Sequence, residues 1–99
     1  MGEKRKIKKR NRILTREVQF EFLAPDAKKV HLVGDFNKWN ISETPMKEDK
    51  NGIWKTTLPL EAGRYEYRFL VDGNWKNDPS CSCCVPNEFG SQNCVRIVG

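Results

Sequence analysis

The sequence lacks the features on which several protein classes depend. It contains one histidine, His31, and no apolar run of about 18 residues, the length that a membrane-spanning helix needs. The amino terminus also lacks the apolar core of a secretory signal. His31 has no acid-base partner nearby in the sequence, and no strand-turn-helix elbow surrounds any serine. We therefore expect a cytoplasmic protein with no membrane span and no nucleophilic triad.

Charge is distributed unevenly along the chain. Residues 1–12 contain seven of the 18 Lys and Arg residues and one of the 13 Asp and Glu residues, a net charge of +6. Residues 13–99 therefore hold 11 basic and 12 acidic residues, a net charge of −1. A run of one sign with so few apolar residues cannot offset the entropy of ordering. We expect residues 1–16 to form a flexible basic tail, which is either simply solvated or an electrostatic tether to RNA, DNA, an anionic membrane or an acidic partner.

Apolar and polar residues alternate at the period of β-strands, and no helical period of useful length is present. The clearest example is GRYEYRFLVDG, residues 63–73, in which one predicted face carries Tyr65, Tyr67, Phe69 and Val71. In VQFEFLAP the predicted inward residues are Val18, Phe20 and Phe22.

Further short strands are predicted over residues 28–34, 52–60 and 93–98, and in the last of these we expect Val95 and Ile97 to face inward. Turn-forming clusters separate the strands at the spacing of a sandwich. A chain of 99 residues has room for one modest core. We predict an all-β sandwich of about six to eight short antiparallel strands, formed by residues 17–99.

Two tryptophans lie in segments whose other residues are typical of turns. Trp39 lies in GDFNKWN, and Trp75 follows the tight turn at residues 72–74. Each indole has few apolar neighbours in the sequence, so each is either a ligand contact or a partly buried plug at the end of the sandwich. Trp54 shares a predicted strand face with two leucines, and we expect it in the core.

The stretches VHLVGDFNKWN, GIWKTTLPLEAGRYEYRFLVDGNWKNDP and VPNEFGSQNCV, in this order, resemble the family-48 carbohydrate-binding modules. That family includes the glycogen-binding domain of AMP-activated protein kinase beta subunits and the amino-terminal domains of isoamylases and branching enzymes. The resemblance covers about residues 17–99. It implies an immunoglobulin-like β-sandwich of the early-set type that binds α-1,4-linked glucan such as glycogen or starch, uses no cofactor and catalyses nothing.

The resemblance also implies a set of site residues and partners. It assigns six residues to glucan binding: Trp39, Trp75, Arg68, Phe89, Ser91 and Asn93. The two tryptophans would form a paired stacking platform, Arg68 stands where the family commonly has Lys, and Phe89 stands where the kinase subunit has Leu. The module would act alone or target a glycogen-metabolising enzyme or kinase-type partner to the polymer. Any assignment to glycoside hydrolase family 13 would reflect the enzymes that such modules accompany.

From the residues alone, several of these positions have ordinary structural interpretations. Arg68 is a surface cation that can pair with Glu66, Asn93 is a hydrogen-bonding residue at the start of a strand, and Phe89 is a cap on the core.

The cysteines crowd toward the carboxyl end of the sequence. They are Cys81, Cys83, Cys84 and Cys94. Four thiolates can hold zinc, but the adjacent Cys83 and Cys84 are awkward joint ligands, and we expect no metal site. A disulfide to Cys94 needs Cα atoms within about 7 Å, and a cytoplasmic location argues against it. We expect free, redox-sensitive thiols in a loop whose oxidation would disturb the adjacent segment VPNEFG.

Two functional classes stay open. The first is the non-catalytic glucan-binding module. The second is a protein-interaction or nucleic-acid-binding module that uses the basic tail and the exposed aromatic residues, on which bases can stack. Enzymatic glucan hydrolysis requires a carboxylate pair in a deep cleft, and no segment predicts one. The dependence of affinity on salt concentration distinguishes the two classes. Binding driven by phosphate contacts weakens steeply as ionic strength rises, whereas glucan binding should be nearly insensitive to it.

Overall fold

Residues 14–99, the part of the chain that the computed structural model describes, form short strands joined by turns. The elements are β1 (Thr15–Leu23), β2 (Val30–Gly34), the 3-10 turn η1 (Asp35–Asn37), β3 (Lys47–Glu48), β4 (Ile53–Glu61), β5 (Gly63–Val71), β6 (Asn74–Lys76), β7 (Cys84–Pro86) and β8 (Gln92–Val98). These residues contain no α-helix, and no helix among them is long and apolar enough to cross a membrane. The prediction of an all-β fold is confirmed.

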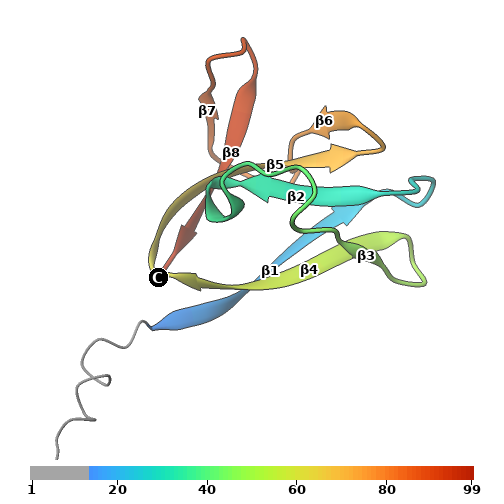
Figure 1. Cartoon of the computed structure of the whole chain (residues 1–99), viewed down its shortest axis with the longest axis horizontal. Helices are drawn as coiled ribbons and strands as arrows, with labels where there is room; N and C mark the ends of the chain where they lie inside the picture. The colour runs from blue at the N-terminus through green and yellow to red at the C-terminus, as the bar shows by residue number, and fades with distance from the viewer. Residues whose placement is uncertain (1–13) are drawn as a thin grey trace, which may run out of the picture.

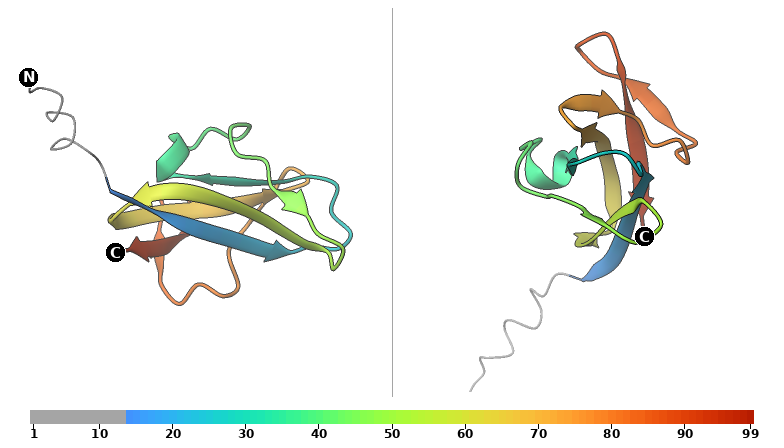
Figure 2. Two further views of the ribbon diagram at one scale, coloured as in Figure 1. Left: turned by 90° about the horizontal axis from the view of Figure 1, so that it is seen from below. Right: turned by 90° about the vertical axis from the view of Figure 1, so that its right-hand side faces the viewer.

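The strands form two antiparallel sheets that pack face to face (Figure 1). One sheet has the strand order β1-β4-β3, and the other has the order β2-β5-β8-β7, with β6 also paired to β5. One edge of β5 pairs with β2, and its other edge pairs first with β8 and then with β6. The β7–β8 hairpin and β6 extend to the same side of the sandwich (Figure 2).

Aromatic side chains fill the space between the sheets. Three of them are at most 2% exposed: Phe20 from β1, and Tyr67 and Phe69 from β5. The ring centroid of Tyr67 lies 5.1 Å from that of Phe20 and 5.8 Å from that of Phe69, and both pairs are arranged edge to face. Trp54 is buried, and its indole N–H donates to the carbonyl oxygen of Ala24 at 2.9 Å. The alternation predicted for β1, β4 and β5 is therefore confirmed, and so is the core position of Trp54.

The inward face of β8 differs from the prediction of Val95 and Ile97. Cys94 is 0% exposed and Val98 is buried, whereas Ile97 is 69% exposed. The register places Cys94 opposite Tyr67, and residues directly opposite each other on neighbouring strands face the same side of a sheet. Because Tyr67 faces the core, Cys94 does too. The predicted face of β8 was wrong by one residue.

The folded part begins slightly earlier than the sequence predicted. β1 begins at Thr15, so its first two residues belong to the segment 1–16 that we assigned to the tail. Leu14 precedes β1 and is exposed, and residues 1–13 lie outside the described residues.

Candidate functional site

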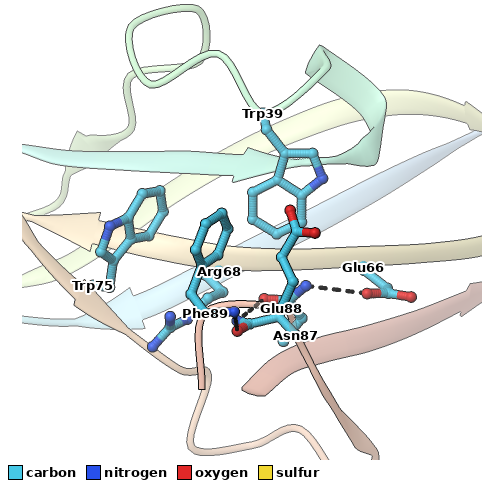
Figure 3. Close-up of a pocket in the computed structure, with 8 residues that line it drawn as sticks. Trp39, Glu66, Arg68, Trp75, Asn87, Glu88 and Phe89 are labelled. Carbon is cyan, nitrogen blue, oxygen red and sulfur yellow. Dashed lines mark hydrogen bonds between the residues drawn. The ribbon is translucent and has the colours of Figure 1, made fainter. Parts of the chain in front are cut away.

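An open groove of about 770 Å³ lies over the outer face of the five-stranded sheet. Three aromatic residues from three different loops or hairpins contribute to it, together with polar residues of the sheet and of the β7–β8 hairpin (Figure 3). The lining residues are Trp39, Glu66, Arg68, Trp75, Asn87, Glu88, Phe89 and Asn93. Apolar rings at the rim and hydrogen-bonding groups below them suit a ligand that is both flat-faced and polar at its edge.

The loop after β2 holds Trp39 through backbone geometry and one carboxylate. Lys38 and Trp39 both have left-handed backbones, with φ of 57° and 58°, a conformation that is uncommon outside glycine. The backbone N–H of Trp39 donates to the Gly34 carbonyl oxygen at 2.9 Å. Asp35 accepts the Trp39 indole N–H at 2.9 Å with Oδ1 and the backbone N–H of Glu66 at 2.8 Å with Oδ2. Asp35 thus links the half-buried indole to β5.

A tight turn places Trp75 beside Arg68. Asp72 and Gly73 have φ of 47° and 83°, the left-handed pair that a type I′ hairpin turn requires. This turn pairs Trp75 with Leu70, on the outward face of β5, and leaves the indole 42% exposed. The guanidinium carbon of Arg68 lies 5.7 Å from the centroid of the indole, within cation–π range.

Polar contacts hold Arg68 and the Trp75 turn. The Nε of Arg68 donates to the side-chain oxygen of Asn77 at 2.7 Å, which fixes the direction of the guanidinium. The Asp72 carboxylate accepts the backbone N–H groups of Lys28 and Lys29, at 2.9 and 2.8 Å. The turn is therefore tied to the loop that precedes β2.

Asn87 organises the tip of the β7–β8 hairpin. Its side-chain oxygen accepts the backbone N–H groups of Phe89 and Ser91 at 2.9 and 3.1 Å. The backbone N–H of Asn87 donates to the Ser91 carbonyl oxygen at 3.0 Å. This arrangement leaves the Phe89 ring 85% exposed. In Figure 3 the ring is seen between the indoles of Trp39 and Trp75.

Asn93 and Glu66 form the polar floor of the groove. The amide nitrogen of Asn93 donates to Glu66 Oε1 at 3.1 Å, and its oxygen accepts from Asn87 at 3.0 Å. Glu66 Oε2 accepts from Arg64 at 3.0 Å. Asn93 is 8% exposed and retains one further N–H and one further lone pair for a ligand.

Five of the six site residues predicted from the sequence line this groove: Trp39, Trp75, Arg68, Phe89 and Asn93. The remaining one, Ser91, is exposed and is absent from the lining of this groove; its backbone instead shapes the hairpin tip.

Four further residues build or line the groove and were not predicted from the sequence: Asp35, Glu66, Asn87 and Glu88. Glu66 precedes Arg68 by two positions on a strand, so the alternation already placed both on the outward face. The role of Asp35 has no such local signal, because its second contact lies 31 positions away.

The cysteines are brought together more closely than the sequence suggested. The sulfur atoms of Cys81, Cys84 and Cys94 all lie within 4.8 Å of one another, and Cys83 is exposed outside this group. Burial is the main cause that raises the pKa of the Cys94 thiol, to about 12. Partial burial raises the pKa of Cys81, but hydrogen bonds with the backbone of Val95 and Cys83 and with the thiols of Cys94 and Cys84 together outweigh it, so the pKa of Cys81 lies below its ordinary value. These three thiols, rather than all four, are the residues that can hold a metal.

Comparison with known proteins assigns the chain to a described family. The model of carbohydrate-binding module 48, the isoamylase N-terminal domain, matches residues 8–86. Protein PTST homolog 2, chloroplastic, of Arabidopsis thaliana is 43% identical over 53 residues, which are 54% of this chain and 10% of the relative.

Two further relatives extend the similarity. The 1,4-alpha-glucan branching enzyme GlgB of Aquifex aeolicus is 42% identical over 72 residues, covering 66% of this chain and 11% of the enzyme. The 5'-AMP-activated protein kinase subunit beta-1 of Sus scrofa is 39% identical over 66 residues, covering 67% of this chain and 51% of the subunit. The chain thus corresponds to about a tenth of the plant and bacterial relatives and about half of the kinase subunit.

Proposed function

Because the chain belongs to the carbohydrate-binding module 48 family, we propose that its groove binds α-1,4-linked glucan of the glycogen or starch type. The observation that carries the proposal is the set of three aromatic side chains, Trp39, Trp75 and Phe89, that line one groove together with hydrogen-bonding groups. We further propose that the two indoles stack on sugar rings and that the module catalyses nothing.

Stacking of the indoles on glucose has a direct physical basis. A glucose ring in the chair form has an apolar patch of C–H groups on each face and hydroxyls around its rim. An indole is a large, rigid plate with only two side-chain torsions, so little entropy is lost when it binds. If each stack buries about 50 to 100 Å² of apolar area, two stacks contribute about 2.5 to 5 kcal/mol before ordering costs.

The polar residues of the groove suit the hydroxyl rim. Arg68 offers several donors, and the amide of Asn93 can donate and accept at once, as neighbouring hydroxyls require. Phe89, exposed at the tip of its hairpin, supplies a third apolar surface. Binding of this strength is weak for one site, and repeated sites on a polymer raise it through avidity.

The charge of the groove favours a neutral ligand over a nucleic acid. Its lining contains one guanidinium, Arg68, and two carboxylates, Glu66 and Glu88, so it is not basic. A phosphate backbone needs clustered Lys and Arg. The alternative function as a nucleic-acid module depends on the basic residues 1–12, outside the described part of the chain.

A non-catalytic role fits the hydrogen bonds of Glu66, one of the two carboxylates in the groove. Glycoside hydrolysis needs one carboxyl group that donates a proton to the leaving oxygen. Both oxygens of Glu66 already accept hydrogen bonds, from Asn93 and Arg64. The groove is also an open surface rather than a deep cleft that excludes water.

The names of the relatives bear on the partner and the location of this module. By their names, two of the relatives are a branching enzyme and a kinase subunit, which supports an enzyme as the partner that this module brings to a glucan. We propose a cytoplasmic location; fluorescence microscopy of the tagged full-length protein tests it, and one relative is named as chloroplastic.

The central experiment measures binding of β-cyclodextrin and glycogen by calorimetry and affinity electrophoresis. We expect Trp39→Ala and Trp75→Ala each to weaken β-cyclodextrin binding by about 10- to 70-fold, the loss of about 1.25 to 2.5 kcal/mol of stacking. Leu23→Ala, which removes an exposed apolar side chain outside the groove, is the matched control and should bind like the wild type.

Ionic strength and truncation separate the two functional classes. Glucan binding should be nearly insensitive to salt and unaffected by deletion of residues 1–12. Full affinity in both Trp variants, or a loss of more than about tenfold on the deletion, would contradict the proposal.

A further inference from the structure

Three thiols converge at the base of the β7–β8 hairpin. The sulfur of Cys81 lies 3.8 Å from that of Cys84, and no two of the Cys81, Cys84 and Cys94 sulfurs are more than 4.8 Å apart. We call these three residues the thiol cluster. It lies outside the residues that line the aromatic groove, so the proposed glucan function does not use it.

The fold brings the thiol cluster together by two separate routes. Cys84 and Cys94 are directly opposite each other in the β7–β8 ladder, so both side chains lie on the same face of the sheet. Cys81 lies in the loop that precedes β7, and its backbone N–H donates to the Asp78 carbonyl oxygen at 3.1 Å. The sequence signal for this arrangement is the three-residue spacing of Cys81 and Cys84, a single C-x-x-C pair. Because the four cysteines do not form the two C-x-x-C pairs that are common in zinc sites, the sequence favoured no metal site.

The local hydrogen bonds also hold two sulfurs in place. Buried Cys94 Sγ accepts the backbone N–H of Asp78 at 3.1 Å, the kind of donor that stabilises a thiolate. Asp78 is itself fixed, because its carboxylate accepts the Tyr67 hydroxyl at 2.7 Å. The Cys81 thiol lies 2.8 Å from the carbonyl oxygen of Cys83, to which it donates.

The sulfur positions are close to those of a zinc site. In tetrahedral zinc coordination the Zn–S distance is about 2.3 Å, which sets neighbouring sulfurs about 3.8 Å apart. The Cys81 to Cys84 separation already has this value, and the remaining pairs need to contract by about 1 Å at most. The difficulty of adjacent ligands does not arise, because Cys83 does not belong to the cluster.

We propose that Cys81, Cys84 and Cys94 form a three-thiolate site for Zn²⁺ or another thiophilic divalent ion, with water in the fourth position. On binding, the thiol protons are lost to solvent and the sulfurs become ligands, so the Cys81 hydrogen bond to Cys83 is replaced by a metal bond. The ion joins the loop that carries Cys81 to both strands of the hairpin. It thereby stabilises the base of the hairpin, directly beside the Val85–Asn93 pair; Phe89 lies at the other end of the hairpin, in its tip.

The test titrates Co²⁺ into the reduced full chain and follows the thiolate-to-cobalt charge-transfer absorption, with Zn²⁺ as competitor. We expect saturation at one equivalent and displacement by Zn²⁺. Cys84→Ser, at an exposed position where loss of folding is not expected, should weaken binding by more than about 100-fold, since loss of even an outer-shell partner costs about 10- to 100-fold. Cys83→Ser is the matched control and should bind like the wild type.

Thermal unfolding supplies a second measurement. Zn²⁺ should raise the midpoint of the wild type and of Cys83→Ser but not that of Cys84→Ser, because an ion stabilises only the state that binds it. Near-ultraviolet circular dichroism checks that each variant is folded. Equal losses in Cys83→Ser and Cys84→Ser, unchanged binding in Cys84→Ser, or the lack of a saturable band in the reduced wild type would each overturn the proposal. The last outcome would leave the cluster as free thiols.

Discussion

The two faces of the five-stranded sheet carry aromatic residues under opposite physical conditions. On the inner face, Tyr67 packs edge to face against Phe69 and against Phe20 of the opposite sheet, and the three buried rings exclude water. On the outer side, Trp75 and Phe89 are 42% and 85% exposed. The inner rings gain free energy from burial in the folded protein, whereas the outer rings leave apolar area exposed to solvent, which the fold itself does not cover.

The buried and the exposed rings are held in place by different interactions. The inner rings are positioned by packing, but Trp39 and Trp75 depend on left-handed backbones at Lys38, Trp39 and Asp72 and on hydrogen bonds to carboxylates. Such backbones cost of order 1 to 3 kcal/mol each and persist where surrounding contacts impose them. Their concentration beside the groove is consistent with a binding role for this surface.

The largest effect that separates the two faces is expected from a matched pair of phenylalanine substitutions. Phe69→Ala should lower the free energy of unfolding by about 3 to 5 kcal/mol, because it leaves a cavity in the core. Phe89→Ala should change that free energy by less than about 0.5 kcal/mol and should weaken glucan binding instead. Urea unfolding and calorimetry measure the two quantities; a stability loss in Phe89→Ala as large as that in Phe69→Ala would remove the distinction.

A substitution at Gly34 tests the close approach of β2 to β5, which supports both the core and the Trp39 loop. A Cβ atom there would lie 2.5 Å from the Glu66 carbonyl oxygen and 2.8 Å from the Tyr67 Cβ, so β2 or β5 must shift. We expect Gly34→Ala to destabilise the fold by about 1 to 3 kcal/mol and also to weaken binding, since the Trp39 loop starts at this residue.

Gly63→Ala is the control for this prediction, measured by the same unfolding and binding assays. At Gly63 the nearest atom to an added Cβ, the Tyr65 hydroxyl oxygen, is 3.7 Å away, so that variant should be as stable as the wild type. Equal stability and equal affinity in the two alanine variants would show that the fold tolerates a Cβ atom at Gly34.

Asp35 is expected to affect binding without contacting the ligand. Asp35→Ala removes the acceptor of the Trp39 indole N–H and the link to Glu66, and should weaken β-cyclodextrin binding by about tenfold, equivalent to about one hydrogen bond. Asp35→Asn keeps one acceptor oxygen and should give an intermediate affinity. Asp26→Ala, in an exposed turn, is the control, and wild-type affinity in Asp35→Ala would show that packing alone orients the indole.

The smallest effect is expected at Arg68. Arg68→Lys keeps the positive charge near the Trp75 indole but loses the planar set of donors, so we expect affinity to change by less than about threefold. Arg68→Ala should lose more than Arg68→Lys. If both variants bind equally well in calorimetry, the guanidinium contributes only by covering one side of the indole.

Much of the fold could be predicted because strand alternation is a local property. In β1 and β5 apolar side chains occupy one set of alternate positions, so the burial of Phe20 and Tyr67 follows from the pattern. In β8 this reasoning failed, because Cys94, Val95, Ile97 and Val98 place apolar groups in both registers. Only the pairing of Cys94 with Tyr67 decides between them.

The sequence by itself determined the five longest strands, β1, β2, β4, β5 and β8, and which face of β5 is polar, since these depend on backbone preferences and on a two-residue period. The short strands β3, β6 and β7 were not predicted. Tertiary structure alone decided that Trp39, Trp75 and Phe89 share one groove, that Asp35 reaches β5, and that Ser91 lies outside the groove. It also aligned Cys84 with Cys94 beside Cys81. The physical reason is that such juxtapositions are set by the register between strands distant in sequence, which no local pattern encodes.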